Sequence, residues 1–221
     1  MNRFLTVVVA SVFSPVLVSN ASAAVINGDV ADARVFNNFG PFSVDSVAST
    51  TIAAGDQGFG NQLRHYVSVF QLPDVGAVAD PFSAATLSFY LNSAGGTSWV
   101  QLGFAGISAR ALPTVLASDA SGGSNVNLSL TTTASAGLKS TSAASLLSFL
   151  NTQYASGAGA NQYVFFASRP TDVGDALWSF ETADSLTPAN RPTLDVTVIP
   201  EPASLGLLAA SALFALRRRR H

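Results

Sequence analysis

Hydrophobic and polar residues alternate in several segments of the chain between residues 87 and 198. Alternation with a period of two is typical of strands that are buried on one face. Five segments show it: Leu87–Leu91, Val100–Phe104, Val126–Leu130, Ala176–Phe180 and Leu194–Val198. Two other runs, Leu63–Leu72 and Gln162–Ala167, are apolar at successive positions, which predicts strands buried on both faces. Glycine- and serine-rich turns separate these segments.

One segment has the spacing of a helix instead. Its apolar residues are Ala143, Leu146, Leu147, Leu150 and Tyr154. Thr141 or Ser142 can cap its start and Gly157 can end it. Many short strands, one short helix and no alternation of strands with helices predict a mainly-β fold, an antiparallel β-sandwich of jelly-roll-like type. We place this domain at residues 24–197.

The N-terminus has the three parts of a secretory signal peptide. Arg3 supplies the positive charge, Phe4–Val18 is apolar, and Ala21-Ser22-Ala23 is a small-residue cleavage site. The alternative is a retained membrane anchor, but the apolar helix is short and contains Pro15. We therefore assign residues 1–23 to a signal peptide, which signal peptidase cleaves after Ala23 or Ala24.

The C-terminus, residues 198–221, also has three parts. Pro200, Glu201 and Pro202 precede an apolar stretch, Ala203–Leu216, of 14 residues. As a helix it would extend roughly 21 Å, less than the ~30 Å hydrocarbon core of a bilayer. The four final arginines, interpreted here as a stop-transfer block rather than a nuclear-localisation signal, are Arg217, Arg218, Arg219 and Arg220.

This tail resembles the PEP-CTERM sorting signal of Gram-negative bacteria. The resemblance implies recognition by an exosortase, which would cut near Pro200-Glu201-Pro202. The protein would be anchored transiently in the inner membrane and then reach the cell envelope, the cell surface or the extracellular matrix. A permanent tail anchor is the alternative.

Charge and composition narrow the function. Charged residues are 11% of the chain, against about 25% in typical soluble domains, and cysteine is absent. Disulfides and thiolate metal sites are therefore excluded. Between residues 24 and 199 there are six basic and twelve acidic residues, so the chain without its end signals is acidic. This balance excludes a nucleic-acid partner that binds through a basic face.

Five segments carry a second resemblance: Asn37–Gly40, Arg64–Pro73, Ala84–Leu91, Phe166–Arg169 and Asn190–Val196. Their order resembles the DNRLRE-type β-sandwich of bacterial surface proteins, which is similar to carbohydrate-binding modules. A proline, Pro170, stands where that family has an acidic residue.

The residues give little support for an enzyme. His65 is the one histidine outside the tail, and its position in an apolar run favours a strand residue over a catalytic base. A glycoside hydrolase needs two carboxyl groups, for which Glu181 and Asp195 are the alternative pair. We expect no catalytic residue and no enzyme activity.

Two weaker signals concern ligands. Tyr90 and Trp99 point away from the apolar face of their segments, so they form a ligand platform for a sugar if the two segments pair as a hairpin. Trp178 shares a face with Phe180, which predicts a core position. For calcium, a weak cofactor prediction, the carboxylates lie in two turn-like pairs: Asp29 with Asp32 and Asp172 with Asp175.

Together these observations predict an exported, non-enzymatic surface or matrix protein. Its role would be structural or adhesive, with exopolysaccharide or biofilm as the partner. The first alternative is a carbohydrate-binding module for the cell's own polysaccharide, and the second is a hydrolase that acts on glycans.

Overall fold

The structure is a computed structural model. It describes residues 22–28, 31–37, 40–45, 49–56, 62–76, 78–97, 101–155, 159–171 and 174–199. Nearly all of the predicted signal peptide, and the sorting tail from Pro200 onward, lie outside the described residues. The two flanking helices of the expected fold fall in those parts of the chain.

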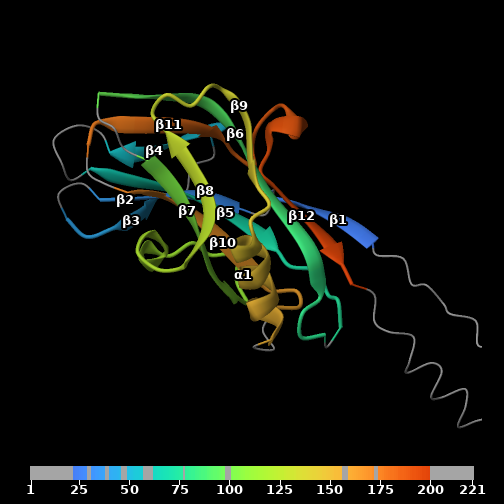
Figure 1. The fold of residues 1–221 in the computed structure, drawn as a ribbon. Helices are drawn as coiled ribbons and strands as arrows, with labels where there is room; N and C mark the ends of the chain where they lie inside the picture. Colours follow the sequence, from blue (N-terminus) through green and yellow to red (C-terminus); the bar gives the residue numbers. More distant parts are fainter. Residues whose placement is uncertain are drawn as a thin grey trace, which may run out of the picture. The chain divides into compact units, whose positions relative to one another are not determined.

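The described chain is a mainly-β, antiparallel fold with one α-helix, as the sequence predicted (Figure 1). The strands are β1 (Ser22–Asn27), β2 (Ala31–Phe36), β3 (Ser43–Asp45), β4 (Thr51–Asp56), β5 (Leu63–Gln71), β6 (Phe82–Gly96), β7 (Gln101–Arg110), β8 (Ser124–Thr131), β9 (Gly137–Thr141), β10 (Tyr163–Pro170), β11 (Ala176–Glu181) and β12 (Thr193–Val198). The helix is α1 (Ala144–Ala155), and two short 3₁₀ helices are η1 (Ala117–Ala120) and η2 (Pro188–Asn190).

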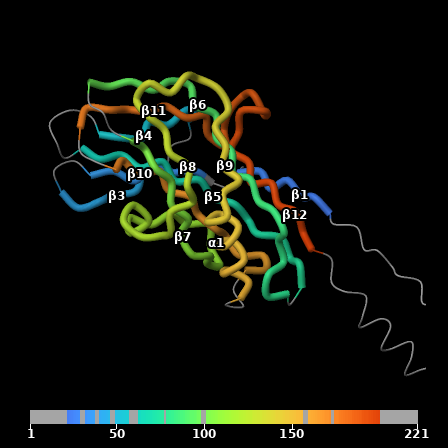
Figure 2. Tube along the Cα trace, viewed as in Figure 1, coloured from blue at the N-terminus to red at the C-terminus, as the bar shows by residue number. Residues whose placement is uncertain are grey.

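Among the described residues these strands form one continuous sheet, in the order β1-β12-β6-β11-β4-β5-β10-β7-β8. Off this path, β2 pairs with β5 and with β3, and β9 pairs with β6. The sheet folds back on itself where β4 meets the start of β5, so that two layers enclose the core (Figure 2). Ring contacts cross between the layers, with 4.6 Å between the centroids of Phe89 and Phe104 and 5.7 Å between those of Tyr66 and Phe180.

The alternating segments bury the faces that the sequence predicted. Leu87, Phe89 and Leu91 of β6 are fully buried, and so are Trp178 and Phe180 of β11. The corresponding residues of the other segments also lie in the core, namely Leu102, Phe104, Val126, Leu128, Leu130, Leu194 and Val196. Burial of this one face fixes the strand register, because a shift by one residue would expose all of these side chains.

The two runs that are apolar at successive positions lie in β5 and β10, and both of their faces are buried. Phe70 and Phe166 belong to the main core, while Val69 and Phe165 belong to a second apolar cluster on the outer face. That cluster includes Val115 and Ala120, which come from the segment between β7 and β8. A chain segment therefore covers this part of the sheet, which explains why these strands lack a polar face.

The predicted helix is confirmed, and one glycine allows it to pack closely. The hydroxyl of Thr141 accepts a hydrogen bond from the N–H of Ala143 just before α1 (3.4 Å), and Gly157 lies outside the described residues. A side chain at Gly106 of β7 would meet the Phe149 ring at 2.5 Å, so glycine makes room for this contact. Phe149 also packs edge-on against Phe166, with 5.8 Å between centroids.

The first and last described strands pair with each other, which the sequence did not predict. Ser22 lies opposite Val198, and Ala23 lies opposite Thr197 (Figure 1). The segment that we assigned to signal cleavage is thus the first part of β1 in this fold. Cleavage after Ala23 or Ala24 stays a prediction.

Candidate ligand-binding groove

The predicted aromatic platform depends on a hairpin that the fold does not contain. β6 pairs with β9, β11 and β12, whereas β7 pairs with β8 and β10, so the two strands do not form the hairpin on which the platform was conditional. Tyr90 lies half-buried in β6, on the face opposite the core, and its cross-strand partner in β9 is Leu138. Trp99 lies outside the described residues. Tyr90 and Trp99 as a ligand platform therefore stay a prediction, because the sequence pattern cannot show which strands are neighbours.

His65 is a buried strand residue of β5, as the sequence favoured. Its Nδ1–H donates to the carbonyl oxygen of Ser168 at 2.8 Å, and its ring packs edge-on against Phe42. Burial lowers the pKa of the imidazole, with the charge of Arg169 acting in the same direction. The neutral ring with its proton on Nδ1 therefore joins β5 to β10.

The two carboxylates of the hydrolase alternative lie on different strands. Glu181 ends β11, which pairs with residues 91–96 of β6. Asp195 lies in β12, which pairs with residues 82–88 of β6. Each of the two strands thus occupies its own stretch of β6, and the structure gives no contact between the two carboxyl groups.

The calcium prediction falls partly outside the described residues, because Asp29 and Asp172 are not described. Asp32 accepts hydrogen bonds from the Ala183 amide and, at 3.1 Å, from the Tyr66 hydroxyl. Burial raises the pKa of Asp32 to about 7. Asp175 is an exposed residue whose carboxylate accepts from the Thr97 hydroxyl at 3.4 Å. Within the described ranges, no group of three or more acidic or histidine residues has the arrangement of a metal site.

The sorting and stop-transfer residues, Pro200 to Pro202 and Arg217 to Arg220, also lie outside the described residues. In the part of the chain that the structure describes, no helix has the length and apolarity needed to cross a bilayer.

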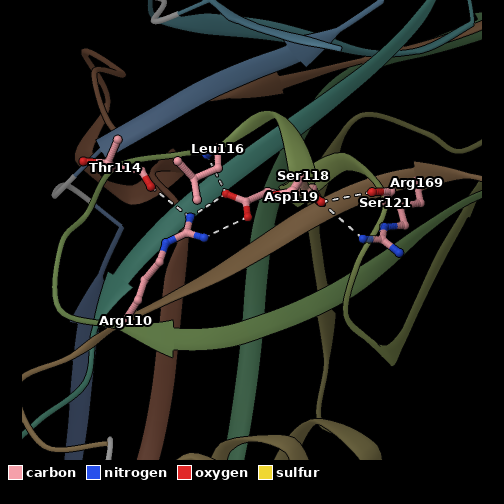
Figure 3. Close-up of polar contacts among 7 residues, drawn as sticks. All are labelled: Arg110, Thr114, Leu116, Ser118, Asp119, Ser121 and Arg169. Carbon is pink, nitrogen blue, oxygen red and sulfur yellow. Dashed lines mark hydrogen bonds and ion pairs between the residues drawn. The ribbon is translucent and has the colours of Figure 1, made fainter. Parts of the chain in front are cut away.

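A buried ionic cluster lies on the outer face, between β7, β10 and η1 (Figure 3). Arg110 donates to both carboxylate oxygens of Asp119 and to the carbonyl oxygen of Thr114. Asp119 also accepts from the Leu116 amide, and Arg169 donates to the Asp119 carbonyl at 3.3 Å. We call these five residues the Asp119 cluster.

The Asp119 cluster is built into the protein rather than open to a ligand. The Asp119 side chain is 2% exposed, and the Arg110 guanidinium lies 3.6 Å from the centroid of the Phe165 ring. Both Asp119 oxygens already accept hydrogen bonds from protein groups. The cluster fastens the β7–β8 segment over the second apolar cluster, so its role is structural.

A different set of polar residues lines an open groove at β2 and the start of β5. The groove has a volume of about 170 Å³. Its lining residues, all half-buried, are Arg34, Phe36, Asn37, Gln62 and Arg64. We call it the arginine groove.

Antiparallel register brings the groove residues together. Arg34 lies opposite Tyr66 and Phe36 lies opposite Arg64. Directly opposed residues share a face, so Arg34, Phe36 and Arg64 lie on the same face as the core residue Tyr66. On its other side Arg64 lies opposite Gly55 of β4, which adds no side chain at that position. The groove is thus a polar continuation of the concave core face.

The groove residues contact one another and residues of β3 and β5. Arg34 forms an ion pair with Asp45 of β3, and its guanidinium lies 5.2 Å from the centroid of the Phe36 ring. The Asn37 side-chain oxygen accepts from the Leu63 amide at 2.8 Å, which fixes this end of the groove. Burial and the positive charge of Arg34 both lower the pKa of Arg64, so the two guanidinium groups interact with each other.

A second cavity, of about 480 Å³, lies near the end of α1. Its two polar side chains, Tyr154 and Asp74, are hydrogen-bonded to protein groups around it. Tyr154 donates to the Pro73 carbonyl at 2.7 Å, and Asp74 accepts from Gly76 and from Asn161. The remaining lining residues are small or apolar, namely Gly76, Val78, Ala79, Ala155, Gly159 and Ala160. Although this cavity is larger, the arginine groove offers more polar groups that converge on one space.

Sequence reasoning missed this site. Arg64 and Asn37 were noted as parts of a family resemblance, while Arg34 was counted in the charge balance. The usable signal was that Arg34 and Phe36 occupy alternate positions of one segment. Their partner Arg64 lies 30 residues later and becomes a neighbour through the β2–β5 register.

Comparison with known proteins gives one likeness worth recording. No family model matches the chain, and no curated protein matches it. Among solved structures the chain is similar to a xylan-binding module, CBM15, with 10% sequence identity and a TM-score of 0.39. The match covers 82% of this chain and 99% of that module. A TM-score of this size does not establish a shared fold or a shared ligand, so the functional argument rests on the groove.

Proposed function

We propose that this chain is an exported, non-catalytic carbohydrate-binding protein whose ligand lies in the arginine groove. The observation that carries the proposal is the convergence of two guanidinium groups, two side-chain amides and one aromatic ring on a single open space. Amide and guanidinium groups supply hydrogen bonds to hydroxyl groups, and an aromatic face packs against the C–H groups of a sugar ring. Ligand sites typically combine apolar surface with a small number of polar groups that converge on the ligand.

A binding role suits these residues better than catalysis. An arginine keeps its proton at neutral pH and cannot act as a general base there. The described titratable groups with raised pKa values, Asp32, Tyr66 and Tyr154, are each hydrogen-bonded to a backbone group of the same chain. The described residues that line the groove can therefore hold and orient a sugar, and they include no acid–base pair that could cleave one.

The terminal segments support export and sorting in this proposal. The apolar run after Arg3 with its Ala-x-Ala site favours secretion through signal peptidase. The Pro200-Glu201-Pro202 segment, the apolar stretch and the arginine block favour processing by an exosortase and delivery to the cell surface or matrix. A surface protein that binds the cell's own exopolysaccharide would act as a structural or adhesive component of that matrix.

Affinity electrophoresis tests the binding proposal. The purified protein is run through gels that contain one polysaccharide each, both neutral (xylan, a mixed-linkage glucan) and acidic (polygalacturonate). We expect retardation by at least one polymer, and loss of that retardation in Arg64→Gln. Retardation lost in Tyr90→Ala or Trp99→Ala but kept in Arg64→Gln would move the site to the predicted aromatic platform. No retardation by any polymer would refute the proposal.

The sorting proposal has a separate test. Replacing Pro200, Glu201 and Pro202 together with alanine should leave the protein in the inner-membrane fraction of its natural host. Unchanged release of this variant into the medium or matrix would contradict processing at that segment. The hydrolase alternative predicts turnover of a glycan that Glu181→Gln abolishes, and we expect no turnover in either protein.

A further inference from the structure

We propose that the cavity of about 480 Å³ near the end of α1 binds the protonated amino group of an amino-sugar unit. We call it the α1 cavity; the segment between β5 and β6, the last turn of α1 and the segment before β10 line it. None of its described lining residues also lines the arginine groove. The inference therefore goes beyond the proposed function and can fail without it.

The α1 cavity has room for a sugar ring as well as for a charged group. Its volume falls within the roughly 300–1,000 Å³ that is typical of small-ligand sites. A side chain at Gly159 would meet the Tyr154 ring at 2.5 Å, so glycine lets the backbone lie directly against that ring. Val78 and Ala160 are half-buried and add apolar surface, which suits the C–H groups of a sugar ring.

The polar side chains of the α1 cavity are hydrogen-bond acceptors. Tyr154 donates its one O–H to the Pro73 carbonyl at 2.7 Å, which leaves the lone pairs of its oxygen for a ligand. Asp74 accepts one hydrogen bond at each oxygen, from the Gly76 amide at 3.2 Å and from the Asn161 side chain at 3.3 Å. An ionised carboxylate has about four acceptor positions, so Asp74 can accept more. A ligand for this space must therefore bring donors.

The charge at the α1 cavity is negative. Among its described lining residues Asp74 carries the only formal charge, and both of its hydrogen-bond donors are neutral amides. Burial and the charge of Asp74 both raise the pKa of Tyr154, so the field of the carboxylate reaches the tyrosine hydroxyl. The last turn of α1, which ends at Ala155, contains no basic residue, and the C-terminus of a helix carries a partial negative charge. Both contributions favour a cation.

An ammonium group fits this cavity better than a metal ion. Calcium takes six to eight oxygen ligands, and within the described ranges no three acidic or histidine residues are grouped as a metal site. An ammonium group has three donors, which the oxygens of Asp74 and Tyr154 can accept. A sugar with a free amine combines this cation with hydroxyl donors and ring C–H groups. Acetylation of the amine removes the charge, so the acetylated unit should bind less tightly.

General attraction between an acidic domain and a cationic polymer must be separated from binding in the cavity. Residues 24–199 contain twelve acidic and six basic residues, so any polyamine is attracted at long range. Salt screens interactions beyond about 10 Å at 0.1 M, while contacts within a site are screened less. Asp80 supplies the matched control, because it is an exposed acidic residue of the same segment and is not a lining residue.

Calorimetry in about 0.15 M salt compares a glucosamine oligomer, its fully N-acetylated form and tetralysine. The measurements are made at a slightly acidic pH, at which the amine is protonated. Each probe is titrated into the purified wild type, Asp74→Asn, Asp80→Asn, Ala79→Trp and Arg64→Gln. Asp74→Asn removes the charge and keeps the shape of the side chain, whereas Ala79→Trp fills the cavity without a change of charge. Thermal unfolding verifies that each variant is folded.

We expect the glucosamine oligomer to bind about fivefold or more tightly than its acetylated form, as for a partly exposed charged contact. Asp74→Asn and Ala79→Trp should remove this preference, and Asp80→Asn should keep it. Equal binding of the two oligomers, or equal losses in Asp74→Asn and Asp80→Asn, would overturn the inference. Binding of tetralysine as tight as that of the glucosamine oligomer would overturn the assignment to an amino sugar.

The same variants separate this inference from the proposed function. Arg64→Gln should keep the preference for the free amine, and Asp74→Asn should keep the retardation by polysaccharide that Arg64→Gln removes. Loss of the amine preference in Arg64→Gln would place the amino sugar in the arginine groove and overturn the α1 cavity as its site.

Discussion

Two sets of arginines in this molecule show how the same side chain can serve the fold or a ligand. In the Asp119 cluster, Arg110 contacts a buried carboxylate through two hydrogen bonds, a backbone carbonyl and an aromatic ring. In the arginine groove, Arg34 has a carboxylate partner at the surface, with side chains 29% and 44% exposed for Arg34 and Asp45. The first set holds a chain segment in place, whereas the second lines an open space. The difference predicts which substitutions cost stability and which cost binding.

The largest expected effect comes from the buried cluster. Asp119→Asn removes the negative charge that pairs with Arg110, while Arg110 stays packed on Phe165. The substitution also weakens the group that accepts a hydrogen bond from the Leu116 amide. Breaking a buried pair in this way costs about 3–5 kcal/mol of unfolding free energy. Urea unfolding measures this loss. A loss below about 1 kcal/mol would show that the cluster is no more important than an exposed ion pair.

The second effect is a dependence of stability on pH that arises from Asp32, in β2 beside the groove. Its folded-state pKa of about 7 lies above the unfolded value of 3.8, so the folded state favours the protonated carboxyl. The resulting stabilisation is complete below about pH 3.8 and is lost as the pH rises through about 7. The free energy of unfolding of the wild type relative to Asp32→Asn should therefore fall by up to about 4 kcal/mol from pH 4 to pH 8. A difference that does not change with pH would mean that Asp32 is ionised throughout.

Arg64→Gln should separate binding from stability. We expect it to weaken carbohydrate binding by about 1.5–3 kcal/mol, the strength of hydrogen bonds to charged groups. Because the Arg64 side chain is half-buried, the free energy of unfolding of the protein should change by less than about 1 kcal/mol in this variant. Calorimetry and urea unfolding on the same preparation measure both values. A large loss of stability with unchanged binding would place Arg64 with the structural arginines.

The smallest effect is expected at Tyr90. This side chain lies on the outer face of β6, next to Leu138 of β9, and is not among the lining residues of the groove. Tyr90→Ala should change the affinity for carbohydrate by less than about twofold. A loss of tenfold or more would show that the aromatic residue is the functional one and that the groove is not.

Much of the fold could be predicted from local patterns, because burial of one face imposes a period of two. The burial of Leu87, Phe89 and Leu91 could be predicted without knowing the neighbouring strands. Trp178 was placed in the core because it lies two residues from Phe180, on the same face of the strand. The strand Ala31–Phe36 was not predicted, although its polar residues Asp32 and Arg34 alternate with the buried Ala33 and Val35. The first strand, Ser22–Asn27, was not predicted, and its first two residues were assigned to a signal peptide.

The site could not be predicted in the same way, because its residues meet through pairing between distant segments. Arg34 and Arg64 are neighbours across β2 and β5, and no local pattern gives that register. The same limit left open whether β6 and β7 form a hairpin; they lie in opposite layers although they follow one another in sequence. Sequence patterns indicated which residues are buried, and the pairing of strands decided which polar residues converge.

The most direct test of the central claim is a map of the binding surface by NMR. Amide chemical shifts of the isotope-labelled protein are followed while a neutral oligosaccharide and then an oligogalacturonate are added. The groove proposal predicts that the largest shifts caused by a bound sugar fall at Phe36, Asn37, Gln62 and Arg64, with little change at Tyr90 and Leu138. Shifts that centre on Tyr90, or no shift with either sugar, would contradict it.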